Sequence, residues 1–338
     1  MSRHAAEGGP RAGWTWGILL LGTGTAFVLS LMSGAGSLDD AELRDTFFEL
    51  RTYRFLNSFL AGAALATGGV LVQGLFRNPL ASPSLLGTSA GASLGGSMVI
   101  LLWDVLLVDF LPDVVPPELV LPIGCLLGAL GALVLLLAVT GRNPDIVTLL
   151  LTGFILSSFF LSISGLITSL AQESWELGRA IVAFTLGGVE AKGPRHVALA
   201  VPMVFGGLAA AWAWGRHLDL LLSGEEEAAS LGVDVGAVRR WTIVWTAVLT
   251  AAAVAIGGNV SFVGLVVPHV LRSRVGALHH RLVPAAFLGG GVFVAFADIL
   301  IRHLPARGTI PLGVVTGLIG APLFLKLLSD RTRTGRLA

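Results

Sequence analysis

Ten long apolar segments, separated by short polar ones, run along the whole chain. Each is close to the ~20 residues that an α-helix needs to cross the ~30 Å of hydrocarbon in a bilayer. The segments are Trp14–Ser33, Phe55–Phe76, Ser84–Trp103, Leu119–Val139, Val147–Leu170, Val197–Trp214, Trp241–Gly257, Val260–Val275, Leu282–Ile301 and Ile310–Leu328. The shortest, Val260–Val275, follows a Gly-Gly-Asn sequence, which favours a broken or re-entrant helix. The pattern predicts an all-α polytopic membrane protein with about ten transmembrane helices, some broken or re-entrant.

Composition agrees with this class. Hydrophobic residues make up 54% of the 338 residues and charged residues 13%, whereas a soluble domain carries roughly 25% charged residues. The first apolar segment follows Arg3 and Arg11, so it also has features of a signal peptide. Its length, and the need for a first span that sets the topology, favour a transmembrane helix.

An even number of spans places both termini on one side of the membrane. With the N-terminus inside, 14 of the 22 Lys and Arg residues fall in cytoplasmic segments, as the positive-inside rule expects. The sequence thus predicts a cytoplasmic N-terminal tail (1–13), one transmembrane domain (14–328) with a cytoplasmic loop at 215–240, and a cytoplasmic C-terminal tail (329–338). The expected location is the bacterial cytoplasmic (inner) membrane.

Three arginines run against this charge bias. Arg51 and Arg54 fall outside, at the mouth of the second span, and Arg302 falls outside after the ninth. One interpretation is snorkelling, or pairing with the nearby Glu49 and Asp45. The other is a docking surface for an acidic partner.

Few other side chains suggest chemistry. Asp298 is a functional candidate because intramembrane acids are costly, but it lies one turn before Arg302 and is placed to pair with it. His269 has no second His or carboxylate at ligand spacing, so a hydrogen-bonded structural histidine is favoured and no metal site is expected. Cys125 is the single cysteine, which excludes an internal disulfide. No set of catalytic residues is present, so an intramembrane enzyme is a poor fit.

The longest polar stretch on the inner side is Gly215–Arg240. Its acidic run Glu225–Glu227 can begin a short helix with Ser223 as its cap, and Gly232 can end it before a second turn over Val233–Val238. Such a helix–turn–helix would suit contact with a nucleotidase subunit; the alternative is a solvated acidic loop. No G-x-x-x-x-G-K-[ST] motif occurs, so energy for transport would come from an ion gradient or from a separate subunit.

A proline-rich connection, "RNPLASP", joins the second and third spans. Pro79 and Pro83 break the helix there, and irregular backbone at membrane depth is tolerated only where it is buried or lines a cavity. Gly87, Gly91 and Gly95 then recur every four residues, which predicts a helix-packing face.

Taken together, these stretches resemble one family, the permease subunits of type II ATP-binding-cassette (ABC) importers for iron chelates, haem and cobalamin. The resemblance runs from about Leu50 to Leu328. It rests on six motifs in order: "LRTYR", "GVLVQG", "RNPLASPSLLGTSAGA", "SGEEEAASLGVDV", "SFVGLVVPHVLR" and "IPLGVVTGLIGAPLFLKLL". Each motif alone is weak, but all six in this order are specific.

The resemblance implies an assembly around a central pathway. The expected partners are a second permease subunit, identical or related, two ATP-binding-cassette ATPases, and a periplasmic or lipid-anchored substrate-binding protein. ATP and Mg are then used by the ATPases, and this chain itself binds no cofactor. No nucleic-acid partner is expected.

The resemblance also assigns roles to individual residues. Arg51, Arg54 and Arg302 match family arginines at the outer mouth that pair with glutamates of the binding protein. The loop between the sixth and seventh spans matches the coupling helices that contact the ATPase. The residues implied in that contact are Glu226, Glu227, Ala228, Ala229, Leu231, Gly232 and Val233.

Family gate residues near the cytoplasmic end map onto Asn78 and Leu80, and a second gate falls near Ile146 and Val147. At this second gate the cobalamin importer has small hydroxyl residues where this sequence has apolar ones, which is compatible with a different cargo. An iron–siderophore complex is the first-choice cargo, with haem or cobalamin as the alternative. An ion-coupled secondary transporter is the alternative of another class, although the membrane-embedded acids that it needs are scarce.

Overall fold

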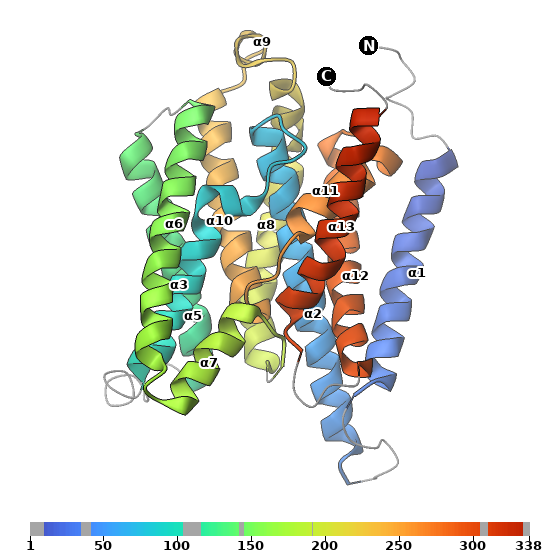
Figure 1. Ribbon diagram of the computed structural model, residues 1–338. Helices are drawn as coiled ribbons and strands as arrows, with labels where there is room; N and C mark the ends of the chain where they lie inside the picture. The colour runs from blue at the N-terminus through green and yellow to red at the C-terminus, as the bar shows by residue number, and fades with distance from the viewer. Residues whose placement is uncertain are drawn as a thin grey trace.

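The computed structural model describes residues 10–34, 42–103, 116–141, 145–190, 192–304 and 310–333. Within these ranges the chain forms twelve α-helices and one 3-10 helix, and no β-strand. Figure 1 shows most of the helices side by side, with their long axes roughly parallel. The predicted all-α class is confirmed.

Each of the ten predicted spans overlaps one α-helix. These helices are α1 (Pro10–Met32), α2 (Arg44–Leu75), α3 (Thr88–Leu102), α5 (Pro117–Thr140), α6 (Ile146–Ala171), α8 (Pro194–Leu221), α10 (Val235–Gly257), α11 (Val263–Val275), α12 (His279–His303) and α13 (Leu312–Arg333). In the described ranges, seven helices are long and apolar enough to cross a membrane, and α3 and most of α13 are shorter apolar helices. The remaining elements are α7 (Trp175–Leu186), α9 (Glu225–Ser230) and the 3-10 helix η2 (Pro83–Leu86).

Helix α7 is the element that the apolar pattern missed. It carries Glu176 and Arg179 within its first two turns, so no long apolar run marks it. Figure 1 shows α7 at the end of the bundle opposite α9. The two ends are therefore called the α7 end and the α9 end below.

Helix α2 forms the centre of the bundle, and nearly all of its membrane-spanning part is buried. Helices α8, α10, α11 and α12 pack around it. Small residues permit this crowding. A Cβ on Gly62 would overlap the carbonyl group of Gly290 in α12, and a Cβ on Gly69 would overlap that of Gly264 in α11.

The predicted glycine stripe on α3 is a packing face. Gly91 and Gly95 lie against the backbone of Gly128 and Gly124 in α5, where any larger side chain would clash. Gly87 differs from the other two because it precedes α3 with a φ of 77°, in the left-handed region that favours glycine. The α3–α5 contact is thus made backbone to backbone.

The chain between α10 and α11 breaks as predicted. Helix α10 ends at Gly257 and α11 begins at Val263, and Gly258 and Phe262 between them have φ values of 67° and 65°. The connection between α7 and α8 holds this break, because the amide of Gly188 donates to the carbonyl oxygen of Gly257 at 3.0 Å. Gly257 and Gly258 are buried, so the irregular backbone at the end of α10 is enclosed in protein, as the bilayer requires.

Gln73 of α2 stabilises the start of α11. Its side-chain amide donates to the carbonyl oxygens of Gly264 and Leu265 at 3.4 and 3.3 Å, and its Oε1 accepts from Arg272 at 3.0 Å. This contact accounts for a polar residue in the centre of an apolar helix.

Both ends of the described chain lie at the α9 end. Figure 1 shows the first turn of α1 and the last turn of α13 at the same end as α9. Helix α1 begins at Pro10 and α13 continues to Arg333, so both helices extend into the tails predicted at 1–13 and 329–338. Residues 1–9 and 334–338 of these tails lie outside the described residues.

Candidate docking and coupling sites

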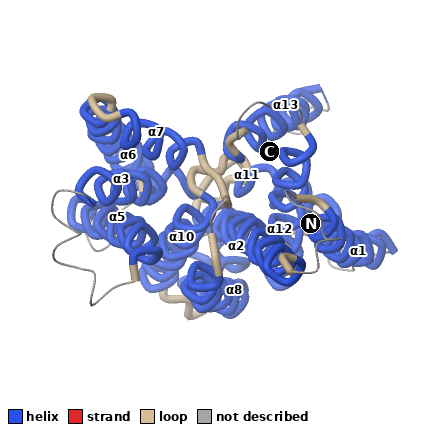
Figure 2. Tube along the Cα trace, turned by 90° about the horizontal axis from the view of Figure 1, so that it is seen from below, coloured by secondary structure: helices blue, strands red, loops and turns tan. Residues whose placement is uncertain are grey.

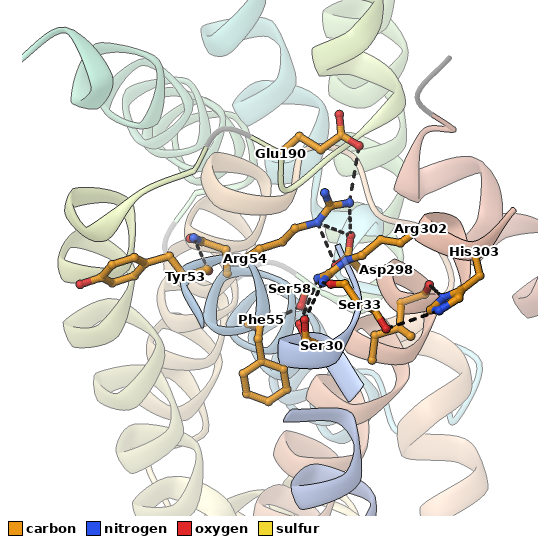
Figure 3. A network of polar contacts seen from close by, with 12 residues as sticks. Ser30, Ser33, Tyr53, Arg54, Phe55, Ser58, Glu190, Asp298, Arg302 and His303 are labelled. Atoms are coloured by element: carbon orange, nitrogen blue, oxygen red, sulfur yellow. Dashed lines mark hydrogen bonds and ion pairs between the residues drawn. The ribbon is translucent and has the colours of Figure 1, made fainter. Parts of the chain in front are cut away.

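Three charged side chains form one buried cluster at the α7 end. This cluster, called the outer cluster below, consists of Arg54, Asp298 and Arg302 (Figure 3). Arg54 donates to both Asp298 oxygens, with distances of 2.8 Å for the closest pair and 3.1 Å for the others. Arg302 also donates to Asp298, from one turn farther along α12. The packing of α2 on α12 brings the three side chains together although Arg54 and Asp298 are 244 residues apart.

The outer cluster is nearly saturated with hydrogen bonds. Arg302 donates further to the carbonyl oxygens of Ser30 and Ser33 at 3.0 and 2.8 Å and to the Ser30 hydroxyl at 3.0 Å. The Asp298 side chain is only 2% exposed, so its charge depends on both arginines. Asp298 therefore pairs with Arg302 as its position one turn away suggested, and with Arg54 as well.

The three arginines that the resemblance assigns to docking differ in how much of each side chain is exposed. Arg51 is buried and donates to the carbonyl oxygens of Leu31 and Gly34 at 2.8 and 3.3 Å. The Arg302 side chain is 5% exposed, and that of Arg54 is 26% exposed. Direct docking by all three stays a prediction, and Arg54 is the one whose side chain reaches the surface most.

The arginines border a basic pocket of about 420 Å³. Its charged lining consists of Arg51, Arg54, Arg302, Lys192 and Glu190. Burial lowers the pKa of the Lys192 ammonium, since desolvation disfavours its charge. Glu190 lies 3.5 Å from Arg54 and is the one carboxylate in this lining, so the pocket as a whole favours an acidic group.

At the other end of the bundle, α9 projects as a small helix between α8 and α10. It begins at Glu225 as predicted, but its N-cap is Gly224 and Ser223 makes no capping hydrogen bond. The predicted Ser223 cap is wrong because the chain turns into the helix one residue later, where Gly224 has a φ of 132° that favours glycine.

The end of α9 is set by Gly232, as predicted. Gly232 has a φ of 85°, and its amide donates to Ala229 while the amide of Val233 donates to Ala228. This pair of hydrogen bonds is the Schellman arrangement that terminates helices. The turn predicted at Val233–Val238 is the beginning of α10, capped by Asp234, whose carboxylate accepts from Ala237 at 2.9 Å.

The residues that the resemblance implies in the ATPase contact are called the coupling segment below, and they divide by burial into two sets. Ala228 and Val233 are buried and hold the segment on the bundle. Leu231 is 66% exposed. The other exposed members are Glu226, Glu227, Ala229 and Gly232.

An ion-paired link that the sequence did not reveal connects α9 to the rest of the α9 end. Glu225 lies 2.7 Å from Arg239 of α10 and 3.9 Å from Arg77, which follows α2. Arg77 has a φ of 50°, rare for a residue other than glycine, and is followed directly by Asn78. The three residues Arg77, Glu225 and Arg239 are called the inner link below.

The positions predicted as gates lie around the same region. The side-chain Oδ1 of Asn78 accepts from the Leu80 amide at 2.9 Å and shapes the turn after α2. Ile146 and Val147 begin α6, which Asp145 caps by accepting from Thr148 at 2.9 Å. The Thr148 hydrogen bonds hold the pKa of the Asp145 carboxyl below its usual value.

One cavity of about 670 Å³ connects these features. Its lining includes Ile146 and Val147 together with all three residues of the inner link. The inner link and the start of α6 therefore border the same cavity, and Arg77 lies directly before the connection that carries Asn78 and Leu80. The described residues contain no group of His, Cys, Asp or Glu side chains able to hold a metal ion.

A bundle with seven helices long and apolar enough to cross a membrane among the described residues, broken at two central connections, suits a membrane transport subunit. The family model described as the FecCD transport family matches residues 15–330. The chain belongs to this family of ABC-importer permeases.

Curated relatives agree along most of the chain. The chain is 36% identical to the Fe(3+) dicitrate transport system permease protein FecD of Escherichia coli, over 83% of this chain and 84% of the relative. It is 34% identical to the hemin transport system permease protein HmuU of Yersinia pestis, over 92% of both chains. It is 36% identical to the cobalamin import system permease protein BtuC of Halobacterium salinarum, over 83% of this chain and 73% of the relative.

A solved structure shows the same fold. An inward-facing conformation of a metal-chelate type ABC transporter superposes with a TM-score of 0.81 at 29% identity. The match covers 93% of this chain and 98% of the other. This chain therefore shares its fold over most of its length with that ABC transporter chain.

Proposed function

We propose that this chain is the permease subunit of an ATP-driven importer that takes up an iron–siderophore complex delivered by a substrate-binding protein. The relatives named above are permeases for ferric dicitrate, hemin and cobalamin, so haem or cobalamin is the alternative cargo. The observation that carries the proposal is the exposed coupling segment on a family-typical bundle. An ion-coupled transporter has no use for such a segment.

In this proposal the α9 end faces the cytoplasm and the α7 end faces outward. Both described chain ends then lie on the cytoplasmic side of the bacterial inner membrane. Two ATPases bind and hydrolyse ATP with Mg. One of them contacts α9 of this chain through Leu231 and the neighbouring glutamates. A second permease subunit, identical or related, completes the pathway.

The coupling step follows from the inner link. When the ATPases close on ATP, they displace α9, and Glu225 carries that displacement to Arg239 and Arg77. The cavity between α9 and the start of α6 allows this movement without repacking the buried core around α2. Rigid-body motion of packed helices is the usual form of such a change.

Docking takes place at the basic pocket of the α7 end. An acidic side chain of the binding protein competes with Asp298 and Glu190 for Arg54, the most exposed of the three arginines. Asp298, which also pairs with Arg302, holds Arg54 in place, and Arg302 and Arg51 add to the positive potential of the pocket. Charge complementarity of this kind mainly raises the association rate and is weakened by salt.

Transport by the assembled importer tests the proposal. The chain is reconstituted in proteoliposomes with the ATPase and binding protein of the same gene cluster, and ferric siderophore, haem and cobalamin are offered separately. We expect ATP-dependent uptake of iron, and the purified binding protein should respond to the siderophore alone in a tryptophan fluorescence titration. Uptake of haem or cobalamin instead would overturn the cargo. Uptake driven by a proton gradient without ATP would overturn the importer class.

A further inference from the structure

Five neutral polar side chains meet at a cavity inside the bundle. Ser82 precedes η2, Ser84 lies within it, and Ser89 lies in the first turn of α3. Asn259 and Ser261 belong to the break between α10 and α11. The cavity has a volume of about 300 Å³. These five residues are called the mid-bundle polar pocket below.

The pocket lies near the middle of the membrane span. Leu65 of α2 lines it, and Leu65 stands ten residues before the end of α2 at Leu75. At 1.5 Å per residue this is about 15 Å, half of the ~30 Å hydrocarbon thickness. The two connections are held at this depth by Gly264, which packs on the backbone of Leu65 and on Pro83.

The polar groups of the pocket are only partly hydrogen-bonded within the protein. The Ser82 and Ser84 hydroxyls contact each other at 2.9 Å, and Ser84 and Asn259 are both exposed. Among the described residues, the Asn259 side chain has no hydrogen-bond partner. An amide left without a partner in hydrocarbon costs several kcal/mol. This surface therefore faces water or a polar ligand, and not lipid.

The pocket reaches the surface of this chain, because Ser84 and Asn259 are exposed. Figure 2 shows loop segments between α7 and α11, flanked by α6 on one side and α13 on the other. If the proposed function holds, the second permease subunit closes this side and the pocket lines the pathway.

The chemistry of the pocket limits what it can hold. Its lining contains hydroxyl and amide groups but no carboxylate, imidazole or thiol, the groups that bind transition metals. Each neutral hydrogen bond is worth about 1 kcal/mol, so a ligand is held briefly and released. We infer that the mid-bundle polar pocket is a cargo subsite that hydrogen-bonds the peripheral oxygen and nitrogen atoms of an intact metal chelate, without contacting the metal. This inference rests on the proposed function.

Substitutions in the assembled importer test the subsite. Asn259→Leu is compared with wild type and with the conservative Asn259→Gln, and Thr23→Ala serves as a matched control because Thr23 bonds only its own helix at 2.8 Å on the peripheral α1. The probes are ferric citrate, haem and cyanocobalamin, and the readouts are initial uptake, ATP hydrolysis stimulated by the binding protein, and affinity for the binding protein.

We expect Asn259→Leu to lower uptake per ATP hydrolysed about fivefold, the equivalent of one lost hydrogen bond, with unchanged binding-protein affinity. Asn259→Gln should recover most of the uptake. Wild-type uptake by Asn259→Leu would overturn the subsite. Absence of ATP-dependent uptake in the wild type itself would instead overturn the proposed function.

If Asn259→Leu folds poorly, a thiol-labelling measurement tests the subsite in its place. Cys125, the single cysteine, is fully buried, so Cys125→Ala gives a background in which Asn259→Cys is the one thiol. We expect a membrane-impermeant thiosulfonate reagent to label this thiol, and the transported chelate to slow the labelling. Absence of labelling, or labelling at the same rate with and without chelate, would overturn the subsite.

Discussion

The two charged sites at opposite ends of the bundle are built on different principles. In the outer cluster, Asp298 is 2% exposed and two arginines share it through several hydrogen bonds. In the inner link, Glu225 and Arg77 have side chains that are 40% and 38% exposed and stand 3.9 Å apart. A buried charge must stay paired, whereas an exposed pair can separate at little cost. The outer cluster is therefore suited to a fixed docking surface, and the inner link to a part that moves.

The largest expected effect comes from breaking the outer cluster. Asp298→Ala leaves Arg302 buried without its carboxylate, and we expect the free energy of unfolding to fall by about 3–5 kcal/mol. Thermal unfolding of the purified protein in detergent measures this. Glu118→Ala is the control, because Glu118 is exposed in its pair with Arg195 and its loss should change little. Equal losses in both variants would remove the distinction between buried and exposed pairs.

A backbone change at the other end should act on coupling and not on stability of the bundle. Gly232→Pro cannot adopt the φ of 85° and lacks the amide that donates to Ala229, so the end of α9 must rearrange. We expect ATP hydrolysis to continue while uptake is lost. Gly232→Asn is the control, since asparagine tolerates the left-handed region. Full uptake by the proline variant would show that this turn is not part of the ATPase contact.

Docking can be examined through Arg54 without removing the buried arginines. Arg54→Gln leaves Arg302 to pair with Asp298, and we expect affinity for the binding protein to fall about tenfold at low salt and less at high salt. Surface-immobilised binding protein and the assembled importer give this affinity. Arg195→Gln is the matched control, because Arg195 is an exposed arginine of the α7 end paired with Glu118. Equal affinities for the Arg54 variant and wild type would exclude Arg54 from docking.

The smallest expected effect concerns the inner link itself. Glu225→Gln removes the exposed pair with Arg77, worth up to about 1 kcal/mol, and keeps an amide oxygen that can still accept from the less exposed Arg239. Uptake per ATP should fall by at most about fivefold, with little change in thermal unfolding. Glu226→Gln controls for loss of negative charge on α9. Combined with Arg77→Gln, the loss should be less than the sum of the single losses if the two residues act together. Additive losses would show that Glu225 does not act through Arg77.

Local sequence signals predicted much of this molecule, and their failures are instructive. The ten spans, the break before Val263 and the end of α9 at Gly232 follow from apolar length and from glycine, which act within a few residues. Helix α7 escaped because Glu176 and Arg179 interrupt its apolar pattern. The Ser223 cap failed because capping depends on the φ of a single residue, Gly224, which composition does not specify.

The sequence by itself determined the class of the protein, since a chain with 54% hydrophobic and 13% charged residues has to satisfy its backbone within membrane helices. It also marked Arg51, Arg54 and Arg302 as arginines in need of a partner. Only the tertiary structure decided which partner, because Arg54 meets Asp298 through the close packing of Gly62 on Gly290, far from either charge. Likewise, the polar pocket of Ser84 and Asn259 exists only because two helix breaks, distant in sequence, pack at the same depth. Hydropathy is a sum over neighbours in sequence, whereas these sites depend on neighbours in space.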